Sequence, residues 1–115
     1  MRGLILVALA ATAVAGSAQA GERTGYAAIV AGDLSQAERM LTTERRIFPQ
    51  RPELMLNLAA VYQQTGRTGA AASLYRDVLA QPAVAMDLPN GSTRSSHAIA
   101  DAALRRFAPT TLANR

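Results

Sequence analysis

The chain of 115 residues contains no cysteine and no lysine, and His97 is its single histidine. The absence of cysteine excludes disulfide bonds, thiol chemistry and cysteine-based metal sites, so stability must come from helix packing. All 12 basic residues are arginine, and the formal net charge is +4. The arginines are scattered, with isolated doublets at 45–46 and 105–106, and do not form the basic stripe of a nucleic-acid-binding surface. We therefore expect no nucleic-acid partner.

The residues that carry most enzyme chemistry are too few or badly spaced. One histidine and scattered single carboxylates cannot supply the clustered ligands of a zinc or calcium site. The spacing of His97, Asp101 and Arg105 predicts a row on one exposed helix face, with a His–Asp pair, and not a catalytic triad. The turn at 66–69 lacks the lysine of a phosphate-binding loop. The sequence therefore predicts no catalytic residues, no cofactor and no metal.

The first 20 residues have the composition of a cleavable signal peptide. Arg2 is followed by an apolar run from Leu4 to Val14 and by the small-residue sequence Ala18-Gln19-Ala20. A membrane anchor is the alternative, but the run is shorter than the roughly 20 residues that span a bilayer. We expect cleavage after Ala20, a periplasmic or secreted mature protein, and no stable membrane anchor after cleavage.

Apolar residues recur at three and four positions on both sides of Thr65-Gly66-Arg67, within residues 52–81. This period predicts two helices that each bury one side. Gly66 suits the left-handed turn that ends a helix, and the short connection makes the two helices antiparallel neighbours. The residues expected to face inward are Leu54, Met55, Leu58, Ala59, Val61 and Tyr62 in the first helix, and Ala71, Leu74, Tyr75, Val78 and Leu79 in the second.

Similar signals mark two helices upstream of this pair. The first is expected over 21–31, and the second is expected to follow Gly32 and to run to about residue 48. Asp33 or Ser35 is the expected cap of the second helix, Pro49 stops it, and Pro52 opens the next one. The second helix is expected to turn five apolar residues inward, namely Leu34, Ala37, Met40, Leu41 and Ile47.

After Gln81 the helical pattern breaks. Two prolines, Asn90 and Gly91 predict an irregular connection over 82–91. Ser92 or Thr93 is the expected cap of a last helix over about 94–107, and Pro109 is expected to end it. Residues 109–115 are predicted to form a flexible tail.

A 34-residue shift superimposes the two halves of the predicted helical region. It places Gly66 on Gly32, Ala71 on Ala37, Tyr75 on Leu41 and Ala59 on Gly25. With this period the chain resembles the tetratricopeptide repeat (TPR) family. The residues that carry the resemblance are Gly25, Gly32, Ala37, Leu41 and Pro49 in the first repeat, and Leu58, Ala59, Tyr62, Gly66, Ala71 and Tyr75 in the second.

The resemblance implies an all-α fold of two TPR-like antiparallel helical hairpins and a C-terminal capping helix. The helical domain would span residues 21–108. Its repeats would cover about 21–51 and 52–83, and its capping helix about 94–107.

The resemblance also implies a binding surface, because the opening helices of TPR proteins line a concave groove that holds a peptide. By position the groove residues are Glu22, Tyr26, Ile29, Glu53, Asn57, Ala60 and Gln64. Asn57 stands where some members hold a peptide carboxylate, whereas Glu22 stands where those members place a cation. For Tyr26 and Asn57, packing and local hydrogen bonding are the alternative role.

The function implied is that of a non-enzymatic bacterial adaptor or scaffold in the periplasm. Its partner would be a protein or peptide of the cell envelope. The alternative is a structural exported protein that self-associates as a homo-oligomer and has no separate ligand.

Overall fold

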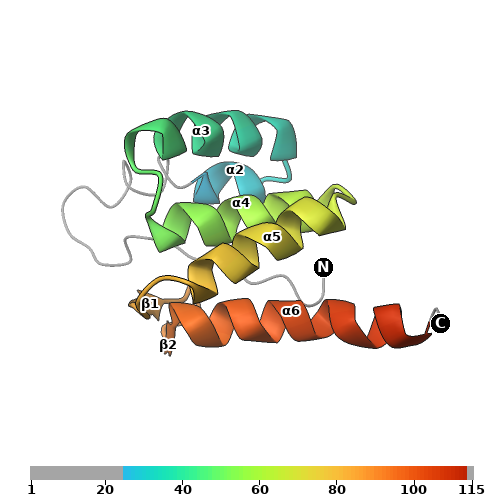
Figure 1. Cartoon of the computed structure of the whole chain (residues 1–115). Coiled ribbons are helices and arrows are strands. Elements are labelled where there is room, and N and C mark those ends of the chain that lie inside the picture. Colours follow the sequence, from blue (N-terminus) through green and yellow to red (C-terminus); the bar gives the residue numbers. More distant parts are fainter. Residues whose placement is uncertain (1–24, 114–115) are drawn as a thin grey trace.

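The computed structural model describes residues 25–113, so the predicted signal peptide 1–20 and Glu22 lie outside the described residues. The described chain is mostly helical, with one small antiparallel sheet (Figure 1). The elements are α2 Tyr26–Val30, α3 Leu34–Ile47, α4 Pro52–Gln64, α5 Thr68–Leu79, β1 Ala85–Asp87, β2 Thr93–Ser95 and α6 Ser96–Ala113.

Each helix packs against the next one along the chain, from α2 through α6, and α6 also touches α4. In Figure 1, α3, α4, α5 and α6 follow one another from the top of the molecule to the bottom. α4 is the centre of the core, because every residue from Leu54 to Val61 is buried. The sequence predicted one apolar face for this helix, but its neighbours cover nearly the whole circumference.

Two turns with the same geometry connect α2 to α3 and α4 to α5. Gly32 and Gly66 both have φ of 84°, a left-handed value that favours glycine. In each turn the residue after the glycine donates its amide to a carbonyl five residues back, as in a Schellman motif. The bonds run from Asp33 N to Ala28 O (2.9 Å) and from Arg67 N to Tyr62 O (2.8 Å).

The predicted boundaries of α3 and α4 are confirmed to within a residue. The side chain of Asp33 accepts a hydrogen bond from Gln36 N at 3.2 Å, and Pro52 occupies the first turn of α4. Ile47 was predicted to face inward and does not, since it is 62% exposed. At 3.6 residues per turn it lies about 100° around the helix from the midpoint of Ala37 and Leu41, which are buried.

The connection after α5 contains a short β-hairpin that the sequence did not predict, so the class is helical with a small sheet and not purely all-α. β1 pairs with β2 in antiparallel register, with Met86 opposite Arg94. Ser96 extends the pairing, because its amide donates to Val84 O at 2.7 Å and its hydroxyl accepts from Val84 N at 2.9 Å. The two strands therefore fix where α6 begins.

Both predicted ends of the last helix need correction. Its cap is Ser95, whose hydroxyl accepts from Ala98 N at 2.9 Å, and not Ser92 or Thr93, because the helix begins only at Ser96. The helix also continues through Pro109 to Ala113, within the segment predicted to be a flexible tail.

Candidate interaction surfaces

The predicted groove residues differ widely in exposure. Asn57 and Ala60 are 0% exposed and Ile29 is 5% exposed. Tyr26 and Glu53 are half-buried, and Gln64 is exposed. The centre of the predicted groove is therefore closed in the 115-residue chain, and a partner reaches Asn57 or Ala60 only after they become exposed.

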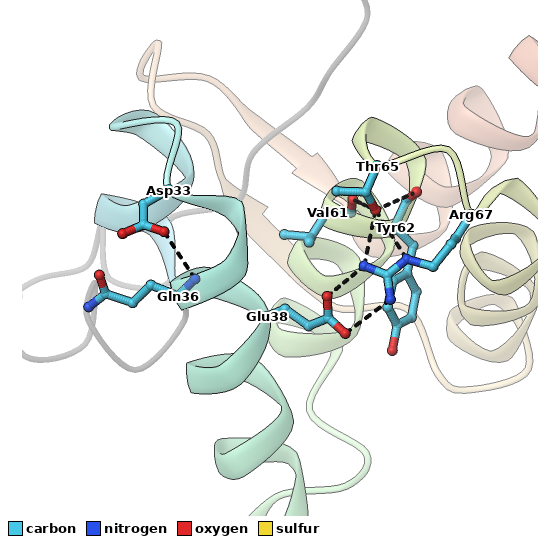
Figure 2. A network of polar contacts seen from close by, with 7 residues as sticks. All are labelled: Asp33, Gln36, Glu38, Val61, Tyr62, Thr65 and Arg67. Carbon is cyan, nitrogen blue, oxygen red and sulfur yellow. Dashed lines mark hydrogen bonds and ion pairs between the residues drawn. The ribbon is translucent and has the colours of Figure 1, made fainter.

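A polar network joins α3 to the turn between α4 and α5 (Figure 2). The guanidinium of Arg67 donates to both carboxylate oxygens of Glu38, at 3.1 Å and 2.5 Å. It also donates to the Thr65 hydroxyl at 3.2 Å and lies 4.6 Å from the centre of the Tyr62 ring. The Thr65 hydroxyl in turn donates to Val61 O at 2.8 Å. The hydrogen bonds of this network run between its own members, so its role is structural. We call the contacts among Glu38, Thr65 and Arg67 the clamp.

The clamp favours the ionised form of the Glu38 carboxylate. Hydrogen bonding from the Arg67 guanidinium holds the pKa of Glu38 below its ordinary value, and the same bond raises the pKa of Arg67. Sequence reasoning missed this pair, because its members lie 29 residues apart and neither stands in a recognisable motif.

The predicted row of His97, Asp101 and Arg105 is only partly present. Arg105 and Asp101 form an exposed ion pair. His97 is half-buried and donates from Nε2 to the Gln81 carbonyl at 2.6 Å, in place of the predicted pair with Asp101. His97 therefore ties the start of α6 to the end of α5. Across residues 25–113, no group of three or more His, Cys, Asp or Glu side chains is placed to hold a metal ion.

An apolar depression lies where the α3–α4 connection meets the residue before β1. We call it the end depression; its volume is about 490 Å³. The guanidinium of Arg51 lies 3.9 Å from the centre of the Phe48 ring at its rim. Sequence reasoning missed this site because Ile47 was assigned to the core. The lining residues are Ile47, Phe48, Pro49, Gln50, Arg51, Pro52, Glu53 and Val84.

Within the described part of the chain, no helix combines the length and the apolar character needed to cross a membrane. No protein family, no curated protein and no solved structure matches this chain. A function must therefore be argued from the geometry of its own residues.

Proposed function

We propose that the protein is a non-enzymatic adaptor of the TPR type, exported to the periplasm, that binds a protein or peptide partner of the cell envelope. One observation carries the proposal. The turns at Gly32 and Gly66 repeat the same dihedral angle and the same hydrogen bonds 34 residues apart. That distance is the TPR period, and α6 covers the last helix pair in the manner of a capping helix.

The accessible part of the opening helices is the proposed contact surface. It consists of Tyr26 on α2 and of Glu53 and Gln64 on α4. An amide and a carboxylate can bind a peptide backbone, and a tyrosine supplies apolar contact at low cost in side-chain entropy. Asn57 and Ala60 belong to this surface only in a state that exposes them.

The proposal is tested by cross-linking the partner to a residue of the proposed surface. A photo-cross-linking amino acid at position 64, introduced into the protein in its host, should capture the partner for identification by mass spectrometry. The purified pair is then measured with a Tyr26→Ala/Gln64→Ala variant. Aromatic contacts at an interface often dominate its energy, so we expect affinity to fall about tenfold or more.

Arg105→Ala is the matched control, because Arg105 is an exposed residue of α6 and does not belong to the proposed surface. His97 is unsuitable as a control, since its ring holds the Gln81 carbonyl. Both variants must retain the circular dichroism spectrum of the parent, because Tyr26 is half-buried. Binding that survives Tyr26→Ala/Gln64→Ala and is lost in Arg105→Ala contradicts the groove assignment and places the partner on α6.

A further inference from the structure

Large apolar side chains that remain exposed gather in the end depression. Among residues 25–107, whose exposure is described, the exposed large hydrophobic residues are Val30, Ile47 and Val84, and the last two both line this depression. Ile47 is 62% exposed and Val84 is 41% exposed, although they come from distant segments. In Figure 1 the α3–α4 connection and β1 lie at the same end of the molecule. Two exposed apolar side chains from separate segments of the chain therefore line one surface depression.

The rim carries one charge of each sign. Arg51 and Glu53 are both half-buried, stand two residues apart, and form no ion pair with any other described residue. In an interface with two-fold symmetry, a residue that contacts a second residue of the partner is matched by the reverse contact. A contact between Arg51 of one copy and Glu53 of the other would therefore occur twice, which gives two equivalent ion pairs. A partner with charge of a single sign would pair with only one of these groups.

We propose that the end depression is the contact surface of a symmetric dimer, and that its occupant is a second copy of this chain. The apolar side chains of Ile47 and Val84 supply the buried area, while the two Arg51–Glu53 pairs set the orientation of the copies. The dimer does not depend on the proposed groove. Glu53 lies at both surfaces, but Tyr26 and Gln64 do not line the depression.

The first experiment measures the dimer and locates it. The protein is expressed from the complete sequence, purified as its host processes it, and sedimented over a range of concentrations. We expect a concentration-dependent dimer, and a dissociation constant at least about tenfold higher for Ile47→Glu, because a charge is then buried at the contact. Val30→Glu is the matched control: Val30 is 60% exposed, lies on α2 and is outside the depression, so the dimer should be unchanged.

The second experiment tests the symmetry through exchanged charges. Arg51→Glu alone and Glu53→Arg alone should each weaken the dimer, since like charges then meet twice. An equimolar mixture of the two variants should form a heterodimer with both pairs restored. Melting temperatures establish that each variant folds, which matters for Arg51 because of its contact with Phe48.

Three outcomes would overturn the proposal: a protein that is monomeric at every concentration, a dimer that persists in Ile47→Glu, or a mixture that dimerises no better than its components. None of them changes the partner-binding test, which depends on Tyr26 and Gln64.

Discussion

Small side chains hold the helices close together at four positions. Ala37, Ala59 and Ala71 are fully buried. At Gly25 an added Cβ would lie 3.0 Å from Leu41 Cγ, in a backbone with φ of 71°. These positions correspond in pairs under the 34-residue shift, Gly25 with Ala59 and Ala37 with Ala71. A larger side chain at any of them must displace a neighbouring helix.

Ala71→Leu is expected to destabilise the protein by about 1–3 kcal/mol, because overpacking moves helices or strains rotamers. Ala71 is 0% exposed, whereas Ala72 beside it is half-buried and has room to direct a longer side chain outward. Chemical denaturation of Ala71→Leu and Ala72→Leu compares the two sites with the same added volume. If both variants unfold at the same denaturant concentration, close packing at Ala71 is ruled out.

The pair α2–α3 is joined to the pair α4–α5 by the contact between Glu38 and Arg67, in addition to the packing of apolar faces. Asp33 and Arg67 follow the two equivalent turn glycines, yet they act differently. Asp33 caps its own helix, α3, whereas Arg67 reaches back to Glu38 on α3 and links α3 to the start of α5. The side chain of Arg67 is 46% exposed and that of Glu38 is 32% exposed, so their ion pair contributes little stability. Its effect is to fix the orientation of α3 relative to the start of α5.

The Glu38–Arg67 contact should be visible in the titration of Glu38. Arg67 lowers the pKa of Glu38 in the folded protein, so its stabilising effect is present above the ordinary value of 4.5 and is lost as pH falls through the lowered pKa. We expect a small difference in stability between the parent and Glu38→Gln at neutral pH, and none well below that pKa.

Nuclear magnetic resonance can measure the pKa of Glu38 directly. In Arg67→Ala it should rise toward its ordinary value. Arg67→Lys should restore only part of the shift, because lysine cannot make the two-point contact. A Glu38 pKa that is equal in the parent and in Arg67→Ala contradicts the contact.

α6 completes the molecule by covering the last helix of the second pair. Tyr75 on α5 is buried against it, with its ring centre 6.4 Å from that of Phe107. The Tyr75 hydroxyl donates to Gln63 Oε1 at 3.0 Å, and burial raises the Tyr75 pKa to about 12. The last element of a repeat array needs a polar outer face, because no further repeat covers it. The exposed ion pair of Asp101 and Arg105 gives α6 such a face.

The location of the mature protein depends on the segment before α2. We expect N-terminal sequencing of protein purified from its native host to begin at Gly21, because Ala18-Gln19-Ala20 has the small residues that signal peptidase requires. Protein that begins at Met1 in a cytosolic fraction would contradict both the cleavage and the proposed work in the periplasm.

Local signals were enough to predict α3, α4 and α5. Apolar spacing, the turn at Gly66, the cap at Asp33 and the proline at Pro52 each act within a few residues, so they can be recognised without knowledge of the fold. The 34-residue shift also predicted that Gly32 and Gly66 are equivalent positions, and both have φ of 84°.

Contacts between distant segments were decided only by the tertiary structure. The β-hairpin depends on pairing across residues 84–96, and the Glu38–Arg67 contact joins two helix pairs. A periodic pattern shows which face of a helix is apolar, but only the packing of the whole chain decides how much of each face is covered, so Asn57 is buried and Ile47 is exposed. The predicted groove is therefore closed at its centre, where Asn57 and Ala60 are buried. The end depression was not predicted by any sequence pattern.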